Sequence, residues 1–157
     1  MKLSIIIPVY NEEKTIIEIL KKIENVRHIK KQIIVIDDKS DDRSFELIDS
    51  FNFESEFKII RHDKNSGKGS CIKSAKNFIS GDIVIIQDAD LEYDPSDYND
   101  IINEIYKEKK KVVYGSRVLN KKRYNQKNFI SNFRIFGNHI LTLLTNCLYF
   151  QKLTDAH

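Results

Sequence analysis

The sequence has few cysteines and no long apolar segment. Its two cysteines, Cys71 and Cys147, lie far apart and form no CxxC pair. This spacing indicates reduced thiols of a cytoplasmic protein, and neither a disulfide framework nor a zinc site. No segment offers the roughly 20 apolar residues that a membrane-spanning helix requires. The N-terminus does not resemble a secretion signal, because the apolar run after Lys2 soon meets a proline and then charged residues.

The overall composition is that of a globular protein. The 157 residues are 41% hydrophobic and 31% charged, which fits one domain with a real core. The net charge of +3 hides an uneven distribution, since residues 107–134 hold ten Lys and Arg against one acidic residue. The rest of the chain carries 16 basic against 22 acidic residues. The basic end therefore indicates an anionic partner.

Short apolar runs alternate with stretches of helical periodicity. The runs are residues 3–9, 32–36, 57–61, 82–86 and 111–114, and the helix-like stretches are 12–24, 42–51, 69–79 and 95–108. The runs are almost continuously hydrophobic, as is typical of strands covered on both faces. This alternation predicts an α/β fold with a doubly wound, mostly parallel sheet and helices on both faces. Ligands of such sheets bind beyond the carboxyl ends of the strands, so the residues that follow each run are the candidate site.

The strongest motif is Gln87-Asp88-Ala89-Asp90-Leu91-Glu92, which directly follows the fourth run. Asp88 and Asp90 stand at a strand end, where a turn lets both carboxylates converge. Mg²⁺ and Mn²⁺ accept hard oxygen ligands and often take one or two carboxylates plus phosphate oxygens. Such an ion would stabilise a diphosphate leaving group, and Glu92 can add a third oxygen. The alternative is a turn with solvated acids, because a DxD motif alone often occurs by chance.

A second acidic cluster runs from Asp37 to Asp42, after the second run. One interpretation is helix capping, in which Ser40 or Asp41 caps a helix that begins near Asp42. Capping does not account for Asp37 and Asp38, which lie at the strand terminus on the ligand side. A carboxylate there can bind a ribose hydroxyl or a base N–H.

The first run ends in Pro8-Val9-Tyr10-Asn11-Glu12-Glu13. Pro8 is expected to end strand pairing and to fix the exit angle of the chain. Tyr10 offers an aromatic face on which a base can stack, and Glu12 offers an acceptor for a base N–H. The alternative is an ordinary strand-to-helix turn with acids in the first helical turn.

Two cationic residues also follow predicted strands. Lys68 lies between two glycines in Asn65-Ser66-Gly67-Lys68-Gly69-Ser70, which is neither a Walker A loop nor a GxGxxG motif. Glycines before a helix start nevertheless suit the close approach of an anion. Arg117 follows the fifth run in Tyr114-Gly115-Ser116-Arg117, where a guanidinium group can hold a phosphate.

The order of these motifs carries more information than any one of them. PVYNEE, DDKSDD, NSGKG, QDADLEYDP and YGSR together resemble the family 2 glycosyltransferases of the GT-A fold. Within that family they look most like the dolichyl-phosphate mannose synthase and polyprenyl-phosphate glycosyltransferase branch, over nearly the whole chain. The resemblance implies an inverting transferase that uses Mg²⁺ or Mn²⁺, a UDP- or GDP-sugar donor and a lipid-phosphate acceptor, with no nucleic-acid partner.

The resemblance also implies a role for individual residues. The nucleotide sugar would be surrounded by Pro8, Tyr10, Glu12, Asp37, Asp38, Lys68, Asp88 and Arg117. The metal would be held by Asp88, Asp90 and Glu92, and the acceptor phosphate by Arg117 and Arg134. Asp155 matches a carboxylate proposed as the base in some relatives, so the implied catalytic set is Asp88, Asp90 and Asp155. Lys39 stands where the family usually has Gly in DDGS, which puts the tight turn there in doubt.

The chain is expected to be one catalytic domain, 1–157, truncated at its C-terminus, because residues 153–157 open a further motif in similar enzymes. Residues 1–117 would bind the nucleotide sugar, and residues 118–157, a basic loop and an amphipathic helix, would serve the acceptor. The apolar face of that helix, predicted for 132–150, consists of Phe136, Ile140, Leu143, Leu144 and Cys147. The helix either caps the core or lies in the membrane interface beside anionic headgroups. The second interpretation predicts a cytoplasmic protein peripherally associated with the membrane.

The hypothesis is a direct displacement at the anomeric carbon by a polyprenyl- or dolichyl-phosphate oxygen. Catalysis would rest on positioning and charge neutralisation, since the acceptor is already anionic. Other interpretations stay open: a transferase with a glycan acceptor, or a nucleotide-binding fragment without turnover. A nucleotidyltransferase usually opens with a glycine-rich loop, which residues 10–13 lack. A Mg²⁺-binding phospho-acceptor module would use His62-Asp63 but gives no role to QDADLE.

Overall fold

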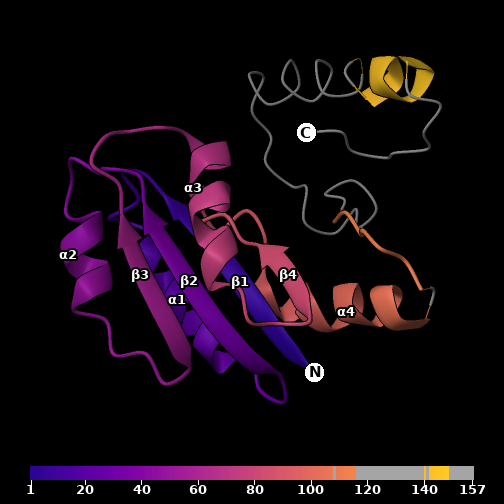
Figure 1. Ribbon diagram of the computed structural model, residues 1–157, viewed down its shortest axis with the longest axis horizontal. Coiled ribbons are helices and arrows are strands. Elements are labelled where there is room, and N and C mark those ends of the chain that lie inside the picture. The colour runs from indigo at the N-terminus through magenta and orange to yellow at the C-terminus, as the bar shows by residue number, and fades with distance from the viewer. Residues whose placement is uncertain (108, 116–139, 141, 149–157) are drawn as a thin grey trace, which may run out of the picture. The chain divides into compact units, whose positions relative to one another are not determined.

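The computed structural model describes residues 1–107, 109–115, 140 and 142–148. The chain divides into two units, Met1–Asn103 and Glu104–His157. The first unit contains a four-stranded sheet of order β3-β2-β1-β4, in which every pair of neighbours is parallel (Figure 1). Its strands are β1 (Lys2–Val9), β2 (Lys30–Asp37), β3 (Glu56–Arg61) and β4 (Ile83–Ile86). The predicted α/β fold with a parallel sheet is thus confirmed.

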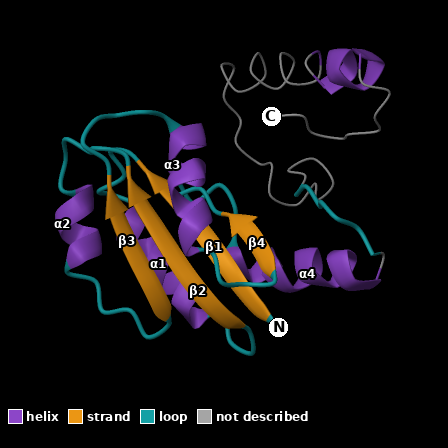
Figure 2. Ribbon diagram, in the orientation of Figure 1, coloured by secondary structure: helices purple, strands orange, loops and turns teal. Residues whose placement is uncertain are grey.

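Helices connect the strands and cover both faces of the sheet. They are α1 (Ile16–Asn25), α2 (Ser44–Asp49) and α3 (Lys68–Ala75), and the 3-10 turn η1 (Lys76–Phe78) extends α3. After β4 come the 3-10 turn η2 (Pro95–Asp97) and α4 (Tyr98–Lys107). Figure 2 shows α3 in front of the sheet and α1 behind it. All four predicted helical stretches therefore exist, although α1 and α2 begin later along the chain than their sequence patterns indicate.

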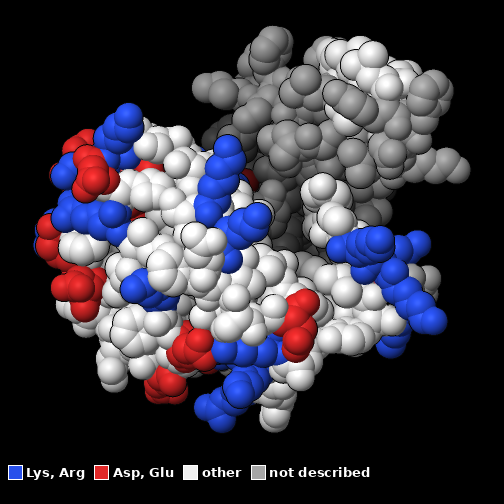
Figure 3. Space-filling model, viewed as in Figure 1, with Lys and Arg blue, Asp and Glu red and all other residues white. Residues whose placement is uncertain are grey.

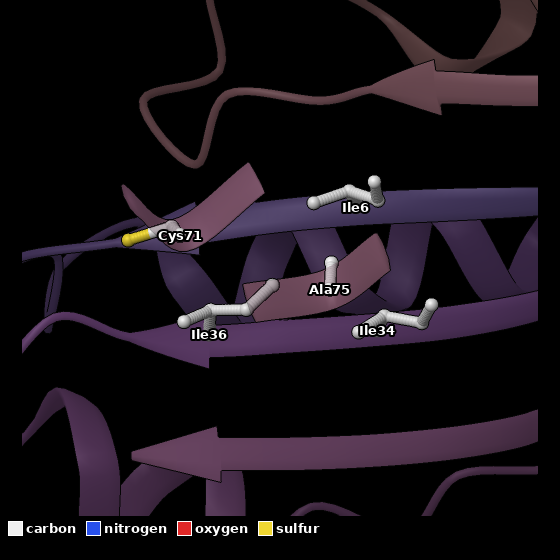
Figure 4. Packing of buried hydrophobic residues seen from close by; sticks show 5 residues of the cluster. All are labelled: Ile6, Ile34, Ile36, Cys71 and Ala75. Atoms are coloured by element: carbon white, nitrogen blue, oxygen red, sulfur yellow. The ribbon is translucent and has the colours of Figure 1, made fainter. Parts of the chain in front are cut away.

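The core between α3 and the sheet fixes the start of α3 against the strand ends. Ile6, Ile34 and Ile36 form one cluster with Cys71 and Ala75 of α3 (Figure 4). Because successive side chains of a strand point to opposite faces, the neighbouring residues of β1 and β2 are buried on the other face, where α1 lies. Each buried isoleucine stabilises the fold by about 1.5–3 kcal/mol, so the strand ends are rigid supports for the loops.

Pro8 does not end strand pairing, contrary to the expectation from sequence. β1 stays paired with β2 through Pro8 and Val9, whereas its pairing with β4 ends at Ile6. The carbonyl of Ile6 accepts from Gln87 on the β4 side, and that of Val9 accepts from Asp38 on the β2 side. Since alternate residues face opposite neighbours, Pro8 faces the β4 side, where no ladder bond needs its missing N–H.

The fifth predicted strand, residues 111–114, is absent from the described part of the chain. Residues 112–115 have no regular secondary structure, and the side chains of Val112 and Tyr114 are 64% and 75% exposed. A short apolar run gains little from an extended conformation unless a paired neighbour covers it. The prediction was wrong because it rested on the β-branched composition of the run alone and did not consider whether a neighbouring strand was there to pair with it.

The helix predicted for residues 132–150 is described at Ile140 and at 142–148, where the chain is helical. The apolar side chains of these turns are exposed, whereas the polar Thr142 is buried. Both interpretations of this helix, a cap on the core or a helix in the membrane interface, stay predictions. No helix in the described ranges is both long and apolar enough to cross a membrane.

Candidate functional site

A pocket of ≈ 280 Å³ lies at the carboxyl ends of β1 and β4, beside the first turn of α3. Its walls combine residues from four separate motifs of the sequence: Pro8, Val9, Tyr10, Glu12, Asp38, Lys68, Cys71, Asp88, Ala89 and Asp90. Seven of these are residues that the sequence assigned to the site. All of these residues belong to the first unit.

Gln87 anchors the loop that carries the DxD motif. Its backbone N–H donates to Ile6, and its buried amide group donates to the carbonyls of Asp88 and Tyr93. The Tyr98 hydroxyl donates to the Gln87 amide oxygen at 2.8 Å. Burial raises the pKa of Tyr98, which keeps this hydroxyl a neutral donor. The loop is therefore tied at both ends to buried groups, which holds its carboxylates at the pocket.

Asp88 and Asp90 of the DxD motif both line the pocket, and Glu92 does not. Asp88 is partly buried and Asp90 is exposed. The chain reverses within this loop, where Leu91 takes a φ of 65° and the Asp90 carboxylate accepts from the Glu92 N–H at 3.0 Å. Such turns within the motif bring alternate side chains to one side. Both acids of the motif thus border the same pocket, and their role as metal ligands stays a prediction.

Lys68 approaches the DxD motif from the opposite wall. Its Nζ lies 2.5 Å from Oδ1 of Asp88. Gly67, at the N-cap of α3, has a φ of 83°, a conformation that suits glycine and turns the chain into the helix. The turn delivers Lys68 into the pocket as the first residue of α3. The sequence placed Lys68 near an anion, but it did not indicate this pairing with Asp88.

Asp37 does not line the pocket. Its side chain is fully buried, pairs with Arg61 Nε at 3.2 Å and accepts from the Ser40 N–H. The parallel register places Arg61 directly opposite Asp37, and the Arg61 guanidinium lies over the Phe45 ring. This carboxylate is thus engaged in joining β2 to β3, beneath the loops of the site.

Asp38 lines the pocket but is also heavily hydrogen-bonded. Oδ1 accepts from His62 Nδ1 at 2.6 Å and from the Ser66 N–H at 3.0 Å, while Oδ2 accepts from the Gly67 N–H at 2.6 Å. His62 Nε2 lies 2.8 Å from Ser74 Oγ. Burial pushes the pKa of Asp38 up, but the hydrogen bonds from His62, Ser66 and Gly67 outweigh it and lower the pKa below its ordinary value. Asp38 therefore stays ionised and holds the loop that leads to Lys68.

His62 and Cys71 are the site residues that sequence reasoning missed. Asp38, His62 and Cys71 each offer a ligand atom, and these atoms lie within 4.8 Å of one another. Both carboxylate oxygens of Asp38 accept hydrogen bonds and both ring nitrogens of His62 have partners, while burial, and then the nearby charge of Asp38, raise the pKa of Cys71 to about 11. We assign this cluster to hydrogen bonding. His62 could have been found only from the register of β2 and β3. That register pairs Asp37 with Arg61, so the residues that follow them, Asp38 and His62, come close together.

The acidic loop after β2 braces the exit of β1. Ser40 Oγ accepts from the Asn11 N–H at 3.0 Å, and Asp42 accepts from the Glu13 N–H at 3.0 Å. Neither Ser40 nor Asp41 caps α2, because that helix begins only at Ser44 and Asp42 accepts from the Ser44 N–H. The capping prediction was thus wrong, because α2 begins at Ser44 and not near Asp42.

The tight turn after Asp38 is kept despite the missing glycine. Lys39, which stands at the usual glycine position, adopts a left-handed φ of 64°. A non-glycine residue pays about 1–2 kcal/mol for this conformation. The surrounding hydrogen bonds of Asp37, Asp38 and Ser40 hold the turn in place.

Tyr10 and Glu12 form the outer wall of the pocket. The Tyr10 ring is 44% exposed, and its hydroxyl lies 3.5 Å from an Asp41 carboxylate oxygen. Glu12 accepts from the Thr15 hydroxyl at 2.6 Å. Both side chains can contact a ligand without first breaking a buried contact.

Three predicted site residues, Arg117, Arg134 and Asp155, lie outside the described residues, as does the predicted boundary at residues 117 and 118. The basic stretch is described only in part. Figure 3 shows Lys and Arg side chains gathered around the C-terminal end of α4, where the sequence has Lys107, Lys109, Lys110 and Lys111. The charge asymmetry read from the sequence is therefore present on the surface of this segment.

Comparison with known proteins gives a consistent family match. Residues 4–157 match the family described as Glycosyl transferase family 2. The dolichol-phosphate mannosyltransferase of Pyrococcus furiosus is 34% identical over 118 residues, which cover 74% of this chain and 33% of that protein. The UDP-N-acetylglucosamine–dolichyl-phosphate N-acetylglucosaminyltransferase of Methanococcus voltae is 29% identical over 97% of this chain and 65% of that protein.

A solved structure supports the same fold. The mannosyltransferase PcManGT from Pyrobaculum calidifontis, determined with GDP-Man and Mn²⁺, superposes with a TM-score of 0.61 at 22% identity. The match covers 66% of this chain and 32% of that one. The chain thus spans a third to about two thirds of the length of these proteins.

Proposed function

The chain belongs to glycosyl transferase family 2, and we propose that it binds a UDP- or GDP-sugar and transfers the sugar, with inversion, to a polyprenyl or dolichyl phosphate. The GT-A fold and the resemblance to polyprenyl-phosphate glycosyltransferases, both expected from the order of the motifs, are confirmed. The donor, the acceptor and the metal dependence are the parts that we propose.

The charge of the pocket is the observation that carries this proposal. Four carboxylates line it, from Glu12, Asp38, Asp88 and Asp90, against the single ammonium group of Lys68. A bare nucleoside diphosphate is itself anionic and would be repelled by such a lining. A divalent cation bound between the carboxylates and the diphosphate removes this repulsion. The pocket therefore favours a metal–nucleotide complex over the nucleotide alone.

The residues present fit Mg²⁺ or Mn²⁺. Asp88 and Asp90 offer only oxygen donors, which these hard ions prefer, and Asp88 already attracts a cationic group in Lys68. When bound, the ion would neutralise the charge that develops on the leaving diphosphate. The protein would contribute the position of these two carboxylates, which the Gln87 anchor fixes.

The other pocket residues have roles that follow from their places. Tyr10 would stack on the base, Glu12 would accept from a base N–H, and Lys68 would meet the diphosphate. Asp38 would act on the nucleoside and also hold the loop before Lys68. Roles for Arg117 and Arg134 at the phosphates, for Asp155 as a base and for Glu92 as a further ligand stay predictions.

A lipid acceptor and a membrane surface complete the proposal. Both curated relatives carry names that specify dolichol or dolichyl phosphate. In this chain, ten cationic residues of 107–134 can attract anionic headgroups. The helical turn that follows exposes Leu143, Leu144 and Leu148, which supports contact with the apolar part of an interface.

The binding step is tested by thermal unfolding of the chain with UDP, GDP and their sugars, each with and without Mn²⁺. A ligand at ~100 Kd should stabilise the fold by about 2.7 kcal/mol, and we expect this only with the metal present. Asp88→Asn and Asp90→Asn should abolish the metal-dependent shift, whereas Asp63→Asn, at an exposed residue outside the pocket, should keep it. An equal shift without metal would refute the metal assignment.

Sugar transfer is tested separately, with polyprenyl phosphate or a soluble glycan as the acceptor. The proposal predicts an inverted glycosyl phosphate with the lipid and no product with the glycan. Release of UDP or GDP without any transfer product, in a chain that binds donor, would contradict the transferase assignment and leave nucleotide binding.

A further inference from the structure

The contact between Lys68 and Asp88 deepens the assignment of the metal site. We propose that Lys68 occupies the cation position of Asp88 while the pocket is empty, and moves to the diphosphate when the metal–nucleotide complex binds. Lys68 would thereby make metal binding depend on the nucleotide. This inference rests on the proposed function of the same pocket.

The geometry brings the ammonium group to the metal ligand itself. Lys68 Nζ lies 2.5 Å from Asp88 Oδ1, so a divalent cation on that oxygen competes with the lysine. Two positive charges on one carboxylate oxygen repel each other, and the compact, strongly hydrated ammonium group can leave on its flexible four-carbon stem. Its side chain is 54% exposed, so much of it can move without breaking buried contacts.

The backbone that carries Lys68 is held in place while its side chain is free to turn. The N–H groups of Ser66 and Gly67, which directly precede Lys68, both donate to the buried carboxylate of Asp38. An added Cβ at Gly67 or Gly69 would meet nothing within 4 Å, so the backbone on either side of Lys68 is not crowded. Because the backbone before Lys68 is anchored, its ammonium group can move from one pocket anion to another while α3 stays in place.

The consequence is a coupling between two ligands. Without nucleotide, Mn²⁺ must compete with Lys68 for Asp88, so its affinity is lowered. With nucleotide, Lys68 gains the diphosphate as a new partner, and the metal gains both the freed carboxylate and phosphate oxygens. Because coupling is reciprocal, Mn²⁺ must raise the affinity for the nucleotide by the same factor.

The test replaces Lys68 with methionine, which keeps the length of the side chain and removes its charge. Mn²⁺ binding is measured by electron paramagnetic resonance of the free ion and by calorimetry, with and without UDP or GDP. Without nucleotide, Lys68→Met should bind Mn²⁺ roughly threefold to tenfold more tightly than the native chain. With Mn²⁺ present, it should bind UDP or GDP roughly tenfold more weakly. Lys68→Arg keeps the positive charge, so it should bind UDP or GDP more tightly than Lys68→Met does.

Lys73→Met is the matched control, since Lys73 lies on the same helix, is exposed and does not line the pocket. It should leave both affinities unchanged. If the native chain binds Mn²⁺ but Lys68→Met binds it no more tightly without nucleotide, the inference about Lys68 is overturned and the metal site survives. If neither protein binds Mn²⁺ under any condition, the metal assignment fails and the inference fails with it.

Discussion

Replacing Asp38 tests whether this carboxylate holds the site together. Asp38→Ala removes the acceptor of three donors, His62 Nδ1 and the N–H groups of Ser66 and Gly67. A buried donor left without a partner costs about 1–3 kcal/mol. Ser66 and Gly67 are exposed residues whose N–H groups water can reach, so the full penalty falls on His62 and smaller ones on the loop. We expect the free energy of unfolding to fall by about 2–4 kcal/mol in total.

The assay is urea unfolding of the chain at neutral pH, followed by circular dichroism. Asp38→Asn is the matched variant, because it keeps the size and one oxygen acceptor but loses the charge, and we expect it to fall between the native chain and Asp38→Ala. The m-value should stay constant, so that the shift in midpoint reports stability alone. A loss of less than about 0.5 kcal/mol in Asp38→Ala would refute the role given to these hydrogen bonds.

The pH dependence of stability in the native chain and in Asp38→Asn gives a second test of this role. The pKa of Asp38 is lowered in the folded chain from its ordinary value of 3.8, since the hydrogen bonds from His62, Ser66 and Gly67 outweigh its burial. A lowered pKa means that the stabilisation is fully present above the unfolded pKa and is lost as the pH falls through the folded pKa. The stability difference between the native chain and Asp38→Asn should therefore be constant near neutrality and shrink below about pH 4. A difference that does not change in acid would contradict the assignment.

Three further predictions concern the scaffold. Gly81→Ala should lower the free energy of unfolding by roughly 1–3 kcal/mol, because a Cβ there would lie 2.6 Å from the Ser4 backbone nitrogen. The control is Gly69→Ala, where a Cβ would meet nothing within 4 Å, so the free energy of unfolding should fall little or rise. Equal stabilities of the two variants in urea would contradict this. Lys39→Gly should raise the free energy of unfolding by up to about 1 kcal/mol, since it relieves the left-handed conformation, and the midpoint of thermal unfolding measures it. In the folded chain a thiol reagent at pH 8 should modify the exposed Cys147 and spare Cys71, which is fully buried and whose pKa is raised to about 11; rapid modification of both before unfolding would show that Cys71 is not buried between α3 and the sheet.

The strands and their order along the chain could be predicted from the sequence because apolar runs alternate regularly with stretches of helical periodicity. The four runs that became β1 to β4 each have a buried partner on at least one side. The run 111–114 has the same composition and no partner in the described chain, and it forms no strand. Composition therefore predicts a strand only where the topology also supplies a neighbour.

The carboxyl-end rule brought the right motifs to one pocket. It placed Tyr10, Lys68, Asp88 and Asp90 together although these residues lie far apart in the sequence, because parallel strands all end at the same edge. It could not predict which charged groups would pair with each other there. The Lys68–Asp88 contact depends on the direction in which α3 starts, and that direction is set by Gly67 and by the hydrogen bonds to Asp38.

The two adjacent acids after β2 show why a motif does not specify the role of each member. Asp37 is the last residue of the strand, so the register of β3 gives it Arg61 as a partner and buries it. Asp38 is one residue further on, turned toward α3 and the pocket, where His62 and the loop N–H groups reach it. Arg61 and His62 both lie more than twenty residues away, at and just after the end of β3, and the sequence pattern does not reveal the register of that strand. One acid therefore joins two strands and the other shapes a binding site, and the difference arises from tertiary pairing instead of from the acids themselves.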